Sequence, residues 1–230
     1  VTLVKSLNSN WRVGVFGQQQ LKDAAVGDLT YGSKNPSVGF LVGWNQYADT
    51  LGYSVVASTV SGSGSYTIGV DKTGVDVKAH QVKLSYTKPL SMDLMLSPYV
   101  GVRRTELKVG GFTESGAEFP LTMSGFSQTT TDLLAGVSVS KKLRESLTGS
   151  ISAGLVHNLQ SSAGQVNVSS DMGSFSSNLS GGRYTSASLG ASLNYEVVKN
   201  HRIGVNIGWQ QRNLNNANIN SVGLSYSLGF

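Results

Sequence analysis

The sequence predicts an all-β fold, a transmembrane antiparallel up-and-down β-barrel. Three observations predict it. Apolar residues alternate with small or polar ones in segments of about ten residues, the length that a tilted strand needs to cross a bilayer. Short and long connections alternate between these segments, as in outer-membrane barrels. The chain also closes on an alternating segment, residues 222–230, which ends on the aromatic Phe230.

Composition narrows the function classes. The chain has 230 residues and no cysteine, which argues against a disulfide scaffold, a thiolate metal site and a cysteine nucleophile. Charged residues make up 13% of the sequence, against roughly 25% in soluble domains. Lysines and arginines are scattered, so a nucleic-acid partner is not expected. The sequence contains no apolar run of about 18 residues, so no transmembrane helix is expected.

The first half of the chain contains five expected strands. In each, apolar residues such as Val13, Val42, Val55, Leu84 and Val100 alternate with glycine, serine or polar residues. This period of two is that of a strand with one face in an apolar environment. The five strands are centred on residues 11–15, 38–45, 53–58, 81–87 and 96–103.

The second half repeats the pattern more regularly. Val137, Ile151, Leu193, Val205 and Leu224 mark the apolar faces of five further strands. Glycine, serine and asparagine fill the opposite faces, and such small groups suit a narrow lumen. These strands are centred on residues 133–140, 147–155, 189–196, 203–210 and 222–230, which brings the expected count to ten.

The connections predict the sidedness of the barrel. Outer-membrane barrels have short periplasmic turns and long extracellular loops, and an even strand count puts both termini on one side. We therefore expect periplasmic termini and extracellular long loops, with residues 66–77 extending a loop hairpin above the membrane. The short connections are residues 48–52, 89–93, 143–146 and 199–201. The long ones are residues 21–37, 61–79, 107–129 and 160–185, and a tight turn at 213–217 breaks the alternation.

The apolar faces carry aromatic residues near the strand ends, as do the interfacial girdles of outer-membrane barrels. The expected girdle residues are Trp11, Trp44, Tyr53, Tyr86, Tyr195 and Trp209. The terminal segment resembles the insertion signal that the barrel assembly machinery reads. Its expected signal residues are Gly223, Tyr226, Leu228 and Phe230.

Charged residues on the polar faces are candidates for the lumen. They either pair with one another in a hydrated interior, or line a pore that accommodates a translocating segment or a plug helix. Both alternatives stay open, because a register slip by one residue reverses every assignment. The candidate lumen charges are Arg12, Lys83, Arg103, Glu196 and Arg212.

No catalytic, cofactor-binding or metal-binding residue is expected. His80, His157 and His201 lie far apart without metal-ligand spacing. A membrane protease of the omptin type needs paired acids beside a histidine. The candidates for that role are Asp71, Asp76 and His157, and no paired-carboxylate element stands beside a histidine. The chain is therefore predicted not to be an enzyme.

Residues 96–134 resemble the middle of an autotransporter (type V secretion) β-domain. They combine a Pro98–Tyr99 pair with a loop element of Phe112, Glu114 and Gly116, followed by Ser and Thr residues at 127–131. The closing segment is similar to the family's last strand, and the resemblance extends over about residues 11–230. It implies that Glu114 has a structural or assembly role where a loop or strand folds into the barrel.

The resemblance implies an outer-membrane translocator that anchors in the membrane and assists export of an N-terminal passenger. Its expected partners are the passenger segment, the barrel assembly machinery, and outer-membrane lipid with lipopolysaccharide. Residues 1–230 are expected to form a single barrel domain. The family pattern has twelve strands and a helix before the barrel, so whether the chain lacks an upstream helix and first strands stays open. The alternatives are a stand-alone small barrel acting as an adhesin or narrow pore, and a soluble β-sandwich.

Overall fold

The computed structural model describes residues 1–19, 24–26, 29–32, 36–47, 51–68, 71–178, 183–211 and 218–229. Within these ranges every regular element is a β-strand. The strands are β1 (Thr2–Ser6), β2 (Trp11–Gln18), β3 (Ala24–Val26), β4 (Leu29–Gly32), β5 (Ser37–Asn45), β6 (Gly52–Ile68), β7 (Asp71–Pro89), β8 (Leu94–Val109), β9 (Phe112–Thr113), β10 (Thr122–Met123), β11 (Phe126–Arg144), β12 (Leu147–Ala163), β13 (Gln165–Ser170), β14 (Gly173–Asn178), β15 (Thr185–Val198), β16 (His201–Gln211) and β17 (Asn218–Gly229).

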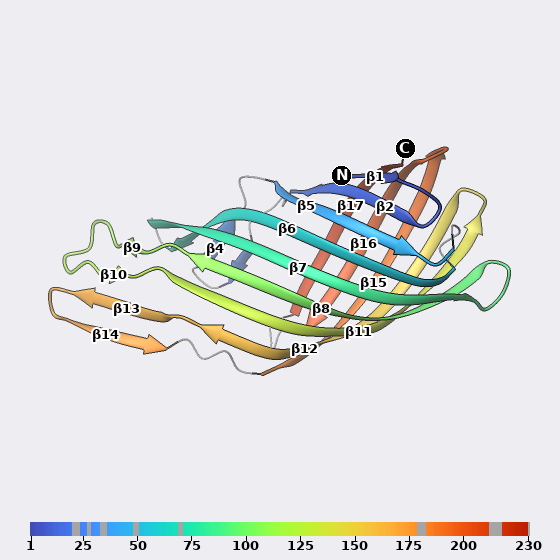
Figure 1. Ribbon diagram of the computed structural model, residues 1–230. Helices are drawn as coiled ribbons and strands as arrows, with labels where there is room; N and C mark the ends of the chain where they lie inside the picture. The colour runs from blue at the N-terminus through green and yellow to red at the C-terminus, as the bar shows by residue number, and fades with distance from the viewer. Residues whose placement is uncertain are drawn as a thin grey trace.

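Eleven of the described strands form a closed ring (Figure 1). Around the wall their order is β6-β5-β2-β1-β17-β16-β15-β12-β11-β8-β7, and the pairing of β7 with β6 closes the barrel. Each neighbouring pair is antiparallel except β1 with β17. The predicted all-β barrel is therefore confirmed. The ring pairs most of the backbone along the wall, as a membrane barrel requires, and at the seam β1 pairs only with residues 227–229 of β17.

The ring contains eleven strands where the sequence suggested ten. The additional strand is β1, which has only five residues and shows too little alternation to be recognised. It pairs antiparallel with β2 and parallel with β17, where Thr2, Leu3 and Val4 lie opposite Ser227, Leu228 and Gly229. The parallel seam follows from the odd count, because eleven strands that alternate in direction begin and end in the same direction.

The two faces of the wall differ as the alternation predicts. Apolar side chains cover the outside, where Ile151 is 69% and Leu224 77% exposed. Their neighbours Ser152 and Ser225 point inward and are half-buried. Exposed apolar surface on this scale is unusual for a soluble protein and typical of a wall that contacts lipid.

Aromatic side chains gather near the short turns. Trp11 lies opposite Trp44, and Tyr53 lies opposite Tyr86 with their ring centroids 4.8 Å apart. Tyr195 occupies the corresponding place on β15, shortly before the turn at residues 199–200. Trp209 lies on β16 near the opposite rim. The wall thus carries a girdle at the short-turn rim, as expected for an interface with a membrane.

The long connections build structure beyond the opposite rim. Strands β6 and β7 remain paired as far as Ile68 and Asp71, so the expected loop hairpin is a continuation of the wall. The β3–β4 hairpin pairs with this extension through β4. A separate four-stranded sheet, in the order β14-β13-β10-β9, projects from the same end, away from the rim at which β17 ends (Figure 1).

Candidate functional site: the barrel lumen

The lumen contains an internal cavity of about 560 Å³. Serine and threonine hydroxyls form most of its wall, and its two cationic groups are Arg12 and Lys83. No aspartate or glutamate lines it. The lining residues are Arg12, Ser54, Val56, Lys83, Ser85, Thr87, Ser97, Tyr99, Ser138 and Ser152.

Arg12 and Lys83 lie at the same level of the wall. The register places Arg12 opposite Gly43, Gly43 opposite Val56, and Val56 opposite Lys83. The Arg12 side chain lies over Gly43, where an added Cβ would come within 2.9 Å of Nε. Arg12 Nη2 donates a hydrogen bond of 3.2 Å to Asn45 Oδ1. The local sequence thus directs the guanidinium along the lumen wall.

Lys83 is oriented by an aromatic ring. Its Nζ lies 5.1 Å from the centroid of Tyr99, within the range of a cation–π contact. Tyr99 itself lies flat against the wall, since its Oη would be 2.5 Å from a Cβ at Gly136 or at Gly154. The two glycines therefore make room for the ring, and the ring in turn holds the ammonium group.

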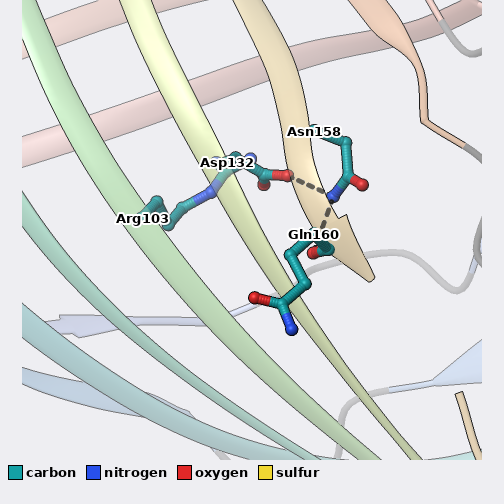
Figure 2. A network of polar contacts seen from close by, with 4 residues as sticks. All are labelled: Arg103, Asp132, Asn158 and Gln160. Carbon is teal, nitrogen blue, oxygen red and sulfur yellow. Dashed lines mark hydrogen bonds and ion pairs between the residues drawn. The ribbon is translucent and has the colours of Figure 1, made fainter. Parts of the chain in front are cut away.

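Arg103 belongs to a buried polar network (Figure 2). Its Nη2 donates to Asp132 Oδ2 at 3.0 Å, and Asn158 Nδ2 donates to Asp132 Oδ1 at 3.0 Å. Asn158 Nδ2 also donates to the carbonyl oxygen of Gln160 at 3.3 Å. Asp132 and Asn158 are 1% and 0% exposed, so the carboxylate depends on these donors.

A register shift forms part of this network. Asp132 lies opposite Asn158 and Thr131 lies opposite Gln160, which leaves Leu159 as an extra residue on β12. Such a bulge redirects the side chains around it. Here it brings the Gln160 carbonyl within reach of the Asn158 amide.

The remaining lumen candidates lie elsewhere. Glu196 sits at the short-turn rim, where its Oε2 is 3.8 Å from Arg202 Nη2 and its Oε1 accepts from the backbone N–H of Asn200. Arg212 lies outside the described residues. The structure therefore pairs Arg103 and Glu196 with residues that were not among the candidates, and it brings Arg12 and Lys83 to one cavity.

The described residues of the candidate assembly signal lie on β17. Gly223 faces the lumen, where an added Cβ would come within 2.9 Å of Asn206 Nδ2. Tyr226 is on the outer face, and its Oη is 2.6 Å from His201 Nδ1. Leu228 lies between His201 and Leu3 in the register. Phe230 falls outside the described residues.

The family-like loop element builds the β9–β10 hairpin beyond the long-loop rim. Phe112 lies opposite Met123, and Gly116 adopts a positive φ of 77° in the connection. Glu114 closes the hairpin twice, because its N–H donates to the Leu121 carbonyl and its Oε2 accepts from the Leu121 N–H. Its role in the structure is local to this loop.

Ser115 ties the hairpin to the barrel wall. Its hydroxyl and its backbone N–H donate to the two carboxylate oxygens of Asp71, at 2.6 and 3.0 Å. These hydrogen bonds, chiefly that of the hydroxyl, lower the pKa of the Asp71 carboxyl below its usual value. Asp71, the first residue of β7, therefore has a structural partner in Ser115 of the loop that faces it.

The residues considered for protease chemistry do not form a cluster. His157 Nδ1 is 2.8 Å from Thr185 Oγ1 on the outer face of β12, while Asp71 contacts Ser115. Asp76 lies opposite Lys108 in the register. Within the ranges described above, no group of three metal-ligating side chains could hold a metal ion.

Sequence reasoning missed Asp132, Asn158 and Asn45 as lumen residues. Each sits at a position of the inward alternation, so the alternation itself contains a signal for them. Their contacts join different strands, and these contacts depend on register and on a bulge.

No helix in the described part of the chain is long and apolar enough to cross a membrane.

Comparison with solved structures supports the fold. The translocator domain of the autotransporter NalP from Neisseria meningitidis matches with a TM-score of 0.67 at 14% identity, over 99% of this chain and 77% of that one. The outer-membrane protease OmpT from Escherichia coli matches with a TM-score of 0.51 at 11% identity, over 95% of this chain and 83% of that one. Among curated proteins, none matches the sequence significantly.

The sequence itself carries a family match. A family model described as "Autotransporter beta-domain" matches residues 3–208, which include every strand from β2 to β15 and most of β16. The closed wall, its apolar exterior and its polar lumen agree with that match. The chain therefore belongs to the autotransporter β-domain family, and it is an outer-membrane translocator barrel.

Proposed function

We propose that this barrel anchors in the bacterial outer membrane and assists export of an N-terminal passenger segment to the cell surface. One observation carries the proposal: the barrel wall of this family member is apolar on the outside, and on the inside hydroxyl and charged groups line a cavity of about 560 Å³. A polypeptide in such a lumen contacts hydrogen-bonding groups and is shielded from lipid.

The proposed orientation places the short turns and the end of β17 in the periplasm. The expected periplasmic N-terminus depended on an even strand count, and with eleven strands it no longer follows, because β1 runs parallel to β17 and so begins away from the short-turn rim. The long connections and the four-stranded sheet then face the cell exterior. Two features support this: the long-loop and short-turn rims differ as in outer-membrane barrels, and β17 runs toward the short-turn rim, where Leu228 lies opposite His201.

Three partners follow from the proposal. The barrel assembly machinery would recognise the last strand through Gly223, Tyr226, Leu228 and Phe230. Outer-membrane lipid and lipopolysaccharide would contact the exposed apolar face of the wall. The passenger segment would pass by or through the lumen. We expect no catalytic role for this barrel, and the residues considered for one, Asp71, Asp76 and His157, have separate surroundings.

The test uses the full-length gene that contains this chain, with an epitope in the region upstream of Val1. Intact cells should display the epitope, and external protease should remove it. Replacing Phe230 with aspartate should block barrel assembly, whereas Ser176→Asp in the exposed strand β14 should not. Normal accumulation of a heat-modifiable barrel with Phe230→Asp would contradict the proposed signal.

A second experiment tests the orientation. Residues 1–230 contain no cysteine, so Ser176→Cys on β14 and Ser91→Cys in a short turn each give one labelling position within the barrel. A membrane-impermeant maleimide should label only Ser176→Cys on intact cells and both variants after lysis. Labelling of Ser91→Cys on intact cells would reverse the proposed orientation. An upstream gene region that encodes only a signal peptide would favour the stand-alone adhesin or pore.

A further inference from the structure

The lumen contains two cations without a carboxylate partner. Arg103 is neutralised by Asp132, and Arg202 lies beside Glu196. No ion pair among the described residues includes Arg12 or Lys83. Their printed contacts are with neutral groups, the Asn45 amide oxygen and the Tyr99 ring. The lumen at this level therefore carries two positive charges that the described wall does not balance.

Both cations open onto the same cavity. They occupy one level across four neighbouring strands, and the remaining lining is mostly hydroxyl groups such as Ser54 and Ser85. Hydroxyl and ammonium or guanidinium groups are all donors for an anion. A cavity walled by protein and surrounded by lipid screens charge less than open water, so it concentrates counter-ions of opposite sign.

We propose that Arg12 and Lys83 form a carboxylate-binding site in the lumen, and that this site makes the interior favour anions over cations. Arg12 offers a planar pair of donors and Lys83 a point charge, a combination that suits a carboxylate. The carboxylate comes either from a small free ion or from an Asp or Glu side chain of a polypeptide within the lumen. The inference rests on the proposed function, because it requires that the wall separates the lumen from lipid.

The test measures access of charged thiol reagents to the cavity. Ser152 lines it and the chain has no cysteine, so Ser152→Cys provides a single reporter in the refolded full chain. A sulfonate-bearing methanethiosulfonate reagent should react faster than a trimethylammonium reagent of similar size. Normalised to a free thiol, the preference should be about ten-fold at low salt, as two nearby charges in a partly aqueous site predict.

The charge variants identify the cause. In Arg12→Gln/Lys83→Gln the preference should fall to about one, because the charges are gone. The matched control Arg104→Gln/Lys108→Gln removes two cations from the outer face of β8 and should leave the preference unchanged. If the lumen double variant does not fold, molar salt should abolish the preference in the Ser152→Cys chain, because the Debye length falls to about 3 Å.

Competition separates the two sources of the carboxylate. Slowing of the sulfonate reagent by free glutamate indicates a site for small carboxylates. Slowing by an acidic peptide alone, with its glutamine counterpart inactive, indicates a site for side chains of a polypeptide.

Three results would overturn the inference: an unchanged preference in Arg12→Gln/Lys83→Gln, no competition by either carboxylate, or no reaction even with a small neutral reagent. Loss of passenger display with an intact anion preference would instead contradict only the proposed function.

Discussion

Removing either member of the Arg103–Asp132 pair should have unequal consequences for stability. The Asp132 side chain is 2% exposed and that of Arg103 is 33% exposed. In Arg103→Gln the buried carboxylate loses its charged partner and keeps two neutral side-chain donors, the Asn158 amide and the Tyr184 hydroxyl. Removing one partner of a buried ion pair costs about 3–5 kcal/mol. We therefore expect Arg103→Gln to lower the free energy of unfolding by an amount in that range.

Asp132→Asn should cost less. The Asn158 amide can still donate to the side-chain oxygen, and Arg103 reaches water through its exposed third. Loss of one charge-assisted hydrogen bond gives a cost of about 1.5–3 kcal/mol. Reversible urea unfolding of the barrel in phospholipid vesicles, followed by the fluorescence of Trp11, Trp44 and Trp209, measures both values. The reasoning fails if Asp132→Asn is as destabilising as Arg103→Gln.

Three further predictions concern other parts of the chain. Gly136→Ala should lower the free energy of unfolding in urea by about 1–3 kcal/mol, because the added Cβ would lie 2.5 Å from the Ala153 carbonyl oxygen and from Tyr99 Oη. The control Gly74→Ala, whose Cβ would have nothing within 4 Å, should be nearly neutral, and equal costs for the two variants would exclude the Tyr99 contact as the cause. Leu224→Arg in the middle of β17 should lower the free energy of unfolding in vesicles by about 2–4 kcal/mol, because a charge on the lipid face costs most at the bilayer midplane. Val198→Arg at the short-turn rim should cost at most about 1 kcal/mol, and the opposite order would contradict the assigned membrane depth. Because the pKa of Asp71 is lowered in the folded state, its hydrogen bonds stabilise the hairpin at neutral pH, and this stabilisation disappears as the pH falls below the usual pKa of 3.8 and through the folded-state pKa. Protease cleavage at residues 114–121 should therefore rise in that acidic range, and the Ser115→Ala variant should be cleaved readily at neutral pH as well.

The wall was predictable because its signal is local. Val205 and Ile207 alternate with Asn206 and Gly208, and the same pattern recurs in the other long strands. Each strand thus specifies its own two faces without reference to its neighbours. Strand β1 was missed for the same reason, since five residues with Lys5 among them contain little of that pattern.

The lumen contacts were less predictable because they join distant parts of the chain. Arg103 and Asp132 lie on neighbouring strands, but only the register and the bulge at Leu159 place Asn158 against them. The four-stranded sheet pairs β10 with β13, from two different long connections. No local periodicity specifies such pairings, because they depend on the closed ring that brings the connections to the same rim.

The parallel seam gives the barrel an uneven mechanical strength. Only three residue pairs join β1 to β17, whereas seventeen join β6 to β7. Over residues 218–226, the described partner of β17 is β16 alone. A sideways pull on the wall, or swelling of the lumen by a bulky object, would concentrate its strain where the fewest hydrogen bonds resist it. The cylinder would therefore unzip along this line while the rest of its circumference stayed intact.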